Sequence, residues 1–131
     1  HGLRVIGVGG AKDLLLGEKT AKEMYQPVLN LTGGTSLSQL AALLKRCTLF
    51  ISNDSGPVHI ASAVGTPVIS LFGRKQKGLS PLRWGPRGKS DRVIHKDVGC
   101  VECLAHNCIK HFACLQAITV EEVVSMAESL L

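Results

Sequence analysis

Short apolar runs alternate with stretches of helical spacing along the first half of the chain. The run "LRVIGVG" (3–9) predicts a strand, and "AKDLLLGEKTAKEMY" (11–25) has the composition and spacing of a helix despite Gly17. "VLNL" (28–31) predicts a second strand. "LSQLAALLKRC" (37–47) predicts a second helix, because its four leucines recur at helical spacing.

The next two strands are predicted to be buried. "LFIS" (49–52) and "PVISLF" (67–72) are nearly continuous apolar runs, which is typical of strands covered on both faces. The residues between them, 57–64, predict a third helix. Strands that alternate with helices at such short intervals indicate a parallel sheet with right-handed crossovers. The predicted fold class is therefore α/β, an open parallel sheet with flanking helices.

The alternation ends after residue 72. Residues 73–91 are rich in Gly, Pro and basic side chains, "RVIH" (92–95) predicts a late strand, and 99–116 is a cysteine-rich loop. "TVEEVVSMAESLL" (119–131) predicts a closing helix. Two helix starts carry reciprocal capping pairs, Ser36 with Gln39 and Thr119 with Glu122.

Length and composition suit one soluble domain. A chain of 131 residues buries roughly two thirds of its unfolded surface, so it needs no disulfide to fold. No apolar run approaches the roughly 20 residues of a membrane span, and the first residues lack the zones of a signal peptide. We expect a cytoplasmic protein. Because His1 and Gly2 open the chain without an initiator methionine, we also expect a fragment of a longer one.

The net charge of +5 is unevenly distributed. Seven cations stand in one stretch in which Asp91 is the only acid: Arg74, Lys75, Lys77, Arg83, Arg87, Lys89 and Arg92. This excess favours an anionic partner such as a nucleotide, a phosphorylated lipid or nucleic acid, and a solvated loop is the alternative. Aromatic residues do not alternate with the basic ones, which makes nucleic acid the weaker interpretation.

The stretch "SNDSGPVHIASAVGTPV" (52–68) places polar residues where the third strand leads into the third helix. Pro57 suits the first helical position, which puts Gly56 at or beside the cap. The amides of Ser55, Gly56 and Val58 would then have no intrahelical acceptor, and a phosphate is a natural partner for them.

Asp54 and His59 flank these amides. Asp54 and Ser55 can hydrogen-bond their own turn or a ligand hydroxyl, and His59 lies in the first helical turn. Two or three charge-assisted contacts give roughly 4–8 kcal/mol before association costs, so this loop alone would bind weakly. The alternative is that these are ordinary capping residues.

The string "NDSGPVHIASAVGTPVISLFG" resembles the signature of the ADP-heptose:lipopolysaccharide heptosyltransferases, glycosyltransferase family nine: N-D-S-G-x-x-H-x-A-A-A-x-G-x-P-x-x-x-L-[FY]-G. "VGGAKD", "LNLTGGTSLSQLAALLKRCTLFISND" and "CVECLAHNCIKHFACLQAITVEEV" are similar to other parts of that family, so the resemblance covers nearly the whole chain. It implies a Rossmann-like domain, the C-terminal, donor-binding half of a GT-B glycosyltransferase. The first strand–helix unit of that domain and the N-terminal acceptor domain with its catalytic base would then be missing, and the fragment alone would be inactive.

The resemblance also implies roles for individual residues. The amides of Ser55 and Gly56 would bind the donor diphosphate, Asp54 would hold the loop or contact donor hydroxyls, and His59 would lie near phosphate or sugar. Thr35 matches a position beside the adenine and ribose.

Two further loops match the family pattern less closely. Lys12 and Asp13 lie in a loop where family members place a donor-contacting residue. After "LFG", many members continue with Pro-Thr, whereas Arg74 and Lys75 follow here, which leaves the contact of this loop with the donor open.

The implied reaction transfers heptose from ADP-heptose to a hydroxyl of the lipopolysaccharide inner core, without a cofactor or divalent metal. The enzyme would be cytoplasmic and peripheral on the inner face of the inner membrane, in contact with anionic lipid. One alternative is a related transferase that uses another nucleotide sugar. Another is a basic module that binds nucleic acid or anionic lipid through residues 74–92.

The cysteine-rich loop allows a metal site. Cys100, Cys103, Cys108 and Cys114 fall within fifteen residues, and "CVEC" has the spacing of a metal knuckle that the other pair does not repeat. Four thiolates could hold a structural zinc or an iron–sulfur cluster, and unligated thiols or adventitious disulfides are the alternatives. Cys47 is expected to be a small buried side chain.

Overall fold

The computed structural model describes residues 2–76, 78–103 and 105–131. Lys77 of the basic stretch and one position of the cysteine-rich loop lie outside these ranges. The chain packs as two compact units, His1–Leu40 and Ala41–Leu131, and each is described by itself. No helix in the described ranges is long and apolar enough to cross a membrane. The sequence predicts one domain, and that stays a prediction.

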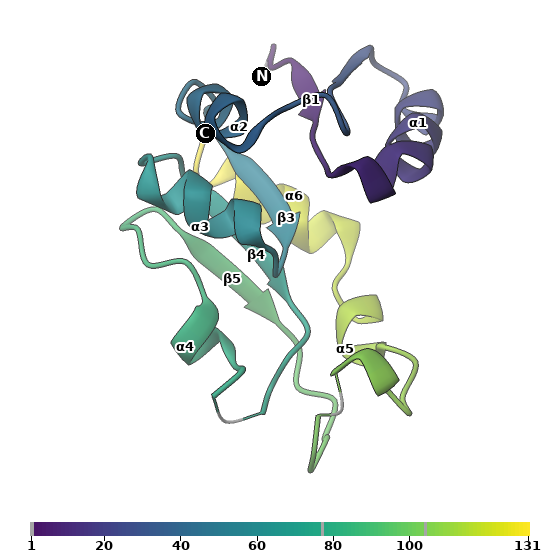
Figure 1. Ribbon diagram of the computed structural model, residues 1–131. Coiled ribbons are helices and arrows are strands. Elements are labelled where there is room, and N and C mark those ends of the chain that lie inside the picture. Colours follow the sequence, from purple (N-terminus) through teal and green to yellow (C-terminus); the bar gives the residue numbers. More distant parts are fainter. Residues whose placement is uncertain (1, 77, 104) are drawn as a thin grey trace. The chain divides into compact units, whose positions relative to one another are not determined.

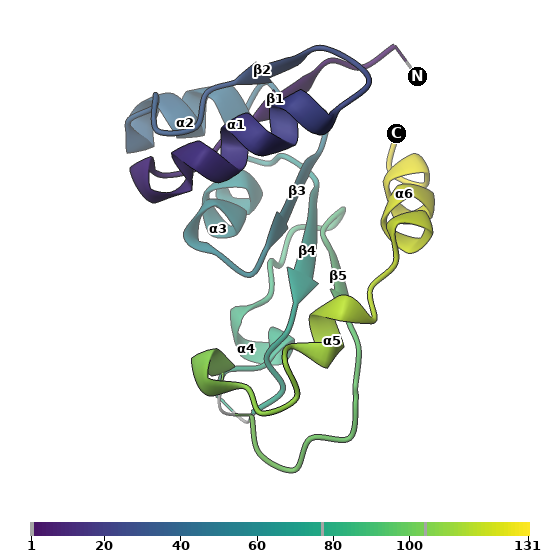
Figure 2. The ribbon, with the colours of Figure 1, turned by 90° about the vertical axis from the view of Figure 1, so that its right-hand side faces the viewer.

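The first unit is a two-stranded parallel sheet with its crossover helix; Figure 1 labels β1 and α1, and Figure 2 also labels β2. Strand β1 pairs with β2 in the register Val5↔Val28. The elements are β1 (Val5–Gly7), the 3-10 turn η1 (Ala11–Asp13), α1 (Leu14–Glu23) and β2 (Val28–Asn30). This confirms the predicted strand–helix–strand order, with both strands shorter than the apolar runs.

Helix α2 (Leu37–Leu44) starts at its predicted capping pair. The Ser36 amide donates to Gln39 Oε1 at 2.8 Å, and the Gln39 amide donates to Ser36 Oγ at 3.2 Å. The reciprocal bonds satisfy two amides that the first helical turn leaves without acceptors, so this prediction is confirmed.

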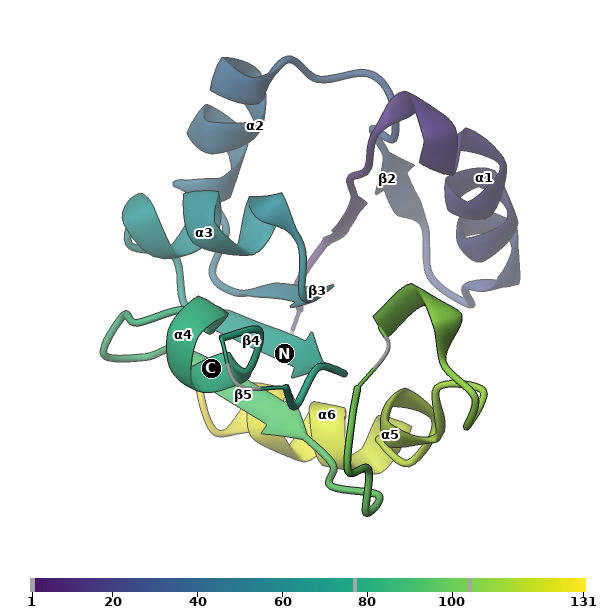
Figure 3. The ribbon, with the colours of Figure 1, turned by 60° about the horizontal axis from the view of Figure 1, so that its bottom comes forward.

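The second unit holds a three-stranded parallel sheet in the order β3-β4-β5. Its helices α3 and α6 lie on opposite faces of this sheet (Figure 2 and Figure 3). The elements are β3 (Phe50–Asn53), α3 (Gly56–Ala63), β4 (Val68–Phe72), α4 (Pro81–Trp84), β5 (Arg92–His95), η2 (Ala105–Asn107), α5 (Ala113–Gln116) and α6 (Val120–Glu128). The predicted α/β class with parallel strands and flanking helices is confirmed.

The core of this unit is centred on β4. Val68, Ile69 and Phe72 have no exposed surface, as predicted for a strand covered on both faces. The same prediction is wrong for β3, which lies at the edge of the sheet and leaves Ile51 45% exposed. An apolar run specifies the preference of a strand for burial, whereas its place in the sheet depends on which strands pair with it.

Asp91 joins three segments of the second unit. Its Oδ2 accepts from the Ser62 hydroxyl and the Gly88 amide, both at 2.6 Å, and its Oδ1 accepts from the Val68 amide at 3.1 Å. The carboxylate thereby ties the end of α3 to the start of β4 and to the loop before β5. In the sequence it stands out only as the single acid among seven cations.

Candidate functional site

Helix α3 begins directly beyond the carboxyl end of β3. Ser55 is the N-cap with an extended backbone (φ −151°, ψ 163°), and Gly56 is the first helical residue, one position earlier than predicted. Pro57 therefore takes the second position, where its missing N–H again costs nothing. The Val58 amide donates to the Ser55 carbonyl at 3.1 Å, so its predicted availability is wrong. The amides of Ser55 and Gly56 have no acceptor among the described residues.

Gly56 is not required by the backbone. Its φ is not positive, and a Cβ built on it would have no atom within 4 Å. A methyl side chain at this position would therefore fit the folded chain. What glycine offers at this position is close approach of a ligand to the backbone.

Asp54 is held by Arg74, which follows β4. The Asp54 amide donates to the Leu71 carbonyl at 3.1 Å, which extends the β3–β4 ladder by one residue. On the side chain, Oδ2 accepts from Arg74 Nε at 3.0 Å and from Arg74 Nη2 at 2.8 Å. The Asp54 side chain is 14% exposed, against 39% for Arg74. The sequence predicts a basic loop in this region, but it does not predict the contact between Arg74 and Asp54.

His59 meets Trp84, the only tryptophan of the sequence. The two rings form an edge contact with centroids 6.5 Å apart and planes at 67°. The indole is fixed by its N–H, which donates to the Gly78 carbonyl at 2.8 Å, and the Arg83 guanidinium lies 5.6 Å from the ring centroid. The sequence does not predict α4 or the place of Trp84. A lone aromatic in a loop rich in Gly and Pro is the signal that could have drawn attention to it.

These groups converge on one small cavity of about 260 Å³. It brings together all four residues predicted around the start of α3 and adds three from the segment after β4, two from the loop and Trp84 from α4. Its lining residues are Asp54, Ser55, Gly56, His59, Arg74, Leu79 and Trp84. Two unpaired amides, the positive end of a helix and a guanidinium make this cavity suited to a phosphate group.

A larger cavity of about 640 Å³ lies beyond the carboxyl ends of the strands in the same unit. It shares Asp54 and Arg74 with the small cavity. Residues 95–103, 106, 108–110 and 112–115 form much of its wall, together with the end of β4. The Asp54–Arg74 ion pair therefore stands between the two cavities.

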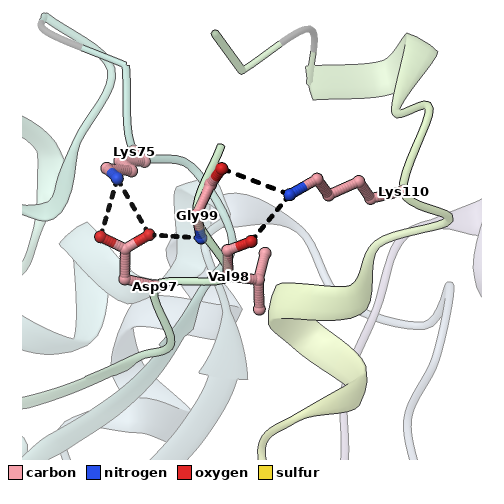
Figure 4. A network of polar contacts seen from close by, with 5 residues as sticks. All are labelled: Lys75, Asp97, Val98, Gly99 and Lys110. Atoms are coloured by element: carbon pink, nitrogen blue, oxygen red, sulfur yellow. Dashed lines mark hydrogen bonds and ion pairs between the residues drawn. The ribbon is translucent and has the colours of Figure 1, made fainter. Parts of the chain in front are cut away.

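A polar network fastens three segments around the large cavity (Figure 4). Lys75 Nζ donates to both carboxylate oxygens of Asp97, at 2.9 and 2.7 Å, and Asp97 Oδ1 also accepts from the Gly99 amide at 2.9 Å. Lys110 Nζ donates to the carbonyls of Val98 (2.8 Å) and Gly99 (3.3 Å). The hydrogen bond from Lys75, followed by that from Gly99, lowers the pKa of Asp97.

All four cysteines of the loop line the large cavity. Cys114 donates its thiol hydrogen to the Gly73 carbonyl at 3.2 Å, and Cys108 Sγ accepts from the Phe112 amide at 3.3 Å. Burial raises the pKa of the Cys114 thiol, and it also raises that of Cys47, which is half-buried rather than buried.

The cysteines do not form a ready metal site. Among the described residues, no group of three or more His, Cys, Asp or Glu side chains is arranged to hold an ion. Cys100, Cys103, Cys108 and Cys114 share a cavity wall without converging as ligands. The zinc or iron–sulfur site stays a prediction.

The remaining predicted site residues belong to the first unit. Lys12 and Asp13 form part of η1, after the carboxyl end of β1, and Asp13 Oδ2 accepts from the Gly10 amide at 2.9 Å. Thr35 follows the carboxyl end of β2. Each thus lies where ligands approach an open parallel sheet, and their contacts with a donor stay predictions.

Comparison with known proteins identifies relatives of one kind. The family model "Glycosyltransferase family 9 (heptosyltransferase)" matches residues 1–113. Lipooligosaccharide heptosyltransferase 2 of Campylobacter jejuni is 31% identical over 135 aligned positions, which cover 100% of this chain and 41% of the relative. Lipopolysaccharide heptosyltransferase 3 of Escherichia coli is 35% identical over 108 positions, which cover 81% of this chain and 30% of the relative.

Solved structures of the same family also match this chain. The crystal structure of a family 9 glycosyltransferase from Veillonella parvula matches with a TM-score of 0.82 at 30% identity, over 98% of this chain and 36% of that one. E. coli ADP-heptose lps heptosyltransferase II matches with a TM-score of 0.80 at 27% identity, over 98% and 36%. The chain thus spans well under half the length of the proteins that it matches.

Proposed function

The chain belongs to glycosyltransferase family 9 (heptosyltransferase), and from this premise we propose that it is the donor-binding part of an enzyme that transfers heptose from ADP-heptose to the lipopolysaccharide inner core. The observation that carries the proposal is the small cavity at the start of α3. It gathers the predicted donor-binding residues Asp54, Ser55, Gly56 and His59 around two unpaired amides.

The donor diphosphate would occupy this cavity. The amides of Ser55 and Gly56 would donate to its oxygens, and the positive end of α3 would add about 0.3–1 kcal/mol. As the bond from the sugar to the diphosphate breaks, negative charge grows on the leaving ADP. Fixed amide donors that face this charge stabilise the transition state more than the ground state. His59, on the first turn of α3, would donate to a phosphate or sugar oxygen.

The rest of the enzyme is part of the same proposal. A carboxylate in an acceptor domain, outside the chain described, would take the proton from the acceptor hydroxyl, and the chain alone would be inactive. Lys12, Asp13 and Thr35 would each contact the donor, Thr35 beside its adenine and ribose, and catalysis would need no cofactor. The acceptor lipid implies work at the cytoplasmic face of the inner membrane. The alternative, a related transferase that uses another nucleotide sugar, would bind the donor diphosphate in the same way.

Calorimetric titration with ADP tests the proposal. Gly56→Val should abolish measurable binding with little change in thermal unfolding, because its Cβ has open space in the folded chain and the side chain would cover the amides. His59→Ala should weaken binding. Ala63→Val, at the far end of the same helix, is the matched control and should bind ADP normally.

Titration with a short oligonucleotide at moderate salt separates the alternative function. Binding of the oligonucleotide without any response to ADP would show a basic nucleic-acid-binding module. Normal ADP affinity in Gly56→Val would show that the diphosphate does not bind in this cavity.

A further inference from the structure

Arg74 reaches the predicted donor residues from a different segment of the chain. It lies 20 positions after Asp54 and contacts a single carboxylate oxygen, Oδ2, through both Nε and Nη2. Within the described part of the chain, Nη1 of Arg74 and Oδ1 of Asp54 have no hydrogen-bond partner. With 39% of its side chain exposed, the guanidinium retains N–H groups that can donate to a ligand.

The charges around the small cavity make the Asp54–Arg74 pair important for the binding of an anion. Among the described residues that line it, Arg74 is the only permanent cation and Asp54 is the only acid. A diphosphate that bound to the amides of Ser55 and Gly56 would come close to the Asp54 carboxylate. Because that carboxylate is largely shielded from solvent, its repulsion of an anion would be poorly screened unless a cation compensated it.

We propose that Arg74 is the cation that binds the donor diphosphate, and that Asp54 acts by orienting the Arg74 guanidinium rather than by contacting donor hydroxyls. This inference rests on the proposed function, because it assumes that a diphosphate enters the small cavity. Arginine suits the role, since its planar fork can bind a carboxylate on one edge and phosphate oxygens with the remaining N–H groups.

Substitution of Arg74 should lower the affinity for the anion, and further substitution of Asp54 should raise it again. Loss of the guanidinium in Arg74→Gln removes a charge-assisted contact and leaves Asp54 uncompensated beside the anion. Further substitution of Asp54→Asn removes that repulsion, so the double variant should regain affinity. If the ion pair only positioned the loop, the affinity of the double variant would recover only as far as the thermal stability of the unliganded chain recovers, because removal of both partners also relieves a shielded, unpaired charge.

The experiment measures the affinity of the full chain for ADP and for inorganic pyrophosphate by calorimetry at low salt. Arg74→Gln should weaken both by about tenfold or more, the loss expected for one charge-assisted hydrogen bond. Arg74→Lys should lose less, because it keeps the charge. Asp54→Asn with Arg74→Gln should bind more tightly than Arg74→Gln alone. Lys75→Gln, the same change of charge one position on, is the control and should bind normally.

The outcomes separate this inference from the proposed function. Equal ADP affinity in the parent chain and in Arg74→Gln overturns the inference and leaves the function standing. Pyrophosphate binding that depends on Arg74, without tighter binding of ADP, supports the inference and overturns the nucleotide donor. A parent chain that binds neither probe overturns both, and a double variant no better than Arg74→Gln overturns the role given to Asp54. Circular dichroism checks that each variant is folded, and Arg74→Lys carries the test if Arg74→Gln is not.

Discussion

Gly17 lies inside helix α1, where intrinsic propensity and tertiary packing predict opposite effects of Gly17→Ala. In an exposed helix interior, alanine is more favourable than glycine by about 0.8–1 kcal/mol. On propensity alone, the substitution would stabilise the chain.

The packing of α1 on the loop after β2 reverses this expectation. A Cβ on Gly17 would collide with Thr32 Oγ1 and would lie 2.9 Å from Thr32 Cβ and 3.2 Å from Asn30 Oδ1. Thr32 is only 9% exposed, and Asn30 Oδ1 accepts from its hydroxyl at 2.7 Å and from its amide at 3.1 Å. Overpacking of this kind costs about 1–3 kcal/mol, and displacement of the hydroxyl adds about 1 kcal/mol. After the gain of about 0.8–1 kcal/mol from helix propensity is subtracted, the net effect should be a destabilisation of about 1–3 kcal/mol.

Urea unfolding followed by circular dichroism measures this difference. The Gly17→Ala variant should unfold at a lower urea concentration than the parent chain. In the double variant with Thr32→Ala, the loss should be smaller than the sum of the two single losses, because the displaced hydroxyl is gone. A Gly17→Ala variant more stable by about 1 kcal/mol, as propensity predicts, would refute the close contact.

Three further results are expected. Asp91→Ala should lower the free energy of unfolding by about 2–4 kcal/mol in chemical denaturation, because three donors lose a charged acceptor. Asp97→Ala should change it little, since Asp97 and its partner Lys75 are both exposed. Lys96 holds the pKa of Glu122 below its usual 4.5, so the pair stabilises the folded chain above that pH and loses this effect as the pH falls through the lowered pKa. Thermal melts from pH 6 to 3 should therefore show a smaller acid shift for Glu122→Gln, and equal shifts would contradict the pairing. ADP should change the emission of Trp84, and an unchanged spectrum at calorimetric saturation would place the ligand elsewhere.

Predictions that rested on neighbouring residues were largely confirmed. Apolar periodicity and the Ser36–Gln39 pair identify α2 and its first residue, since a helix start depends on side chains within one turn. The string at 52–68 locates the start of α3 to within one position. The family resemblance is confirmed as well, because it rests on an ordered motif and not on packing.

The sequence by itself therefore determined the order of the five strands and of helices α1, α2, α3 and α6, the start of α3 to within one position, and the family. The tertiary structure alone decided that Arg74 binds Asp54, that Trp84 faces His59, that Gly17 has no room for a Cβ and that β3 lies at the edge of its sheet. The physical reason is the range of the interactions. Periodicity and capping act within a few residues, whereas parallel pairing of β3 with β4 brings together loops about twenty residues apart, and no local preference specifies which side chains then meet.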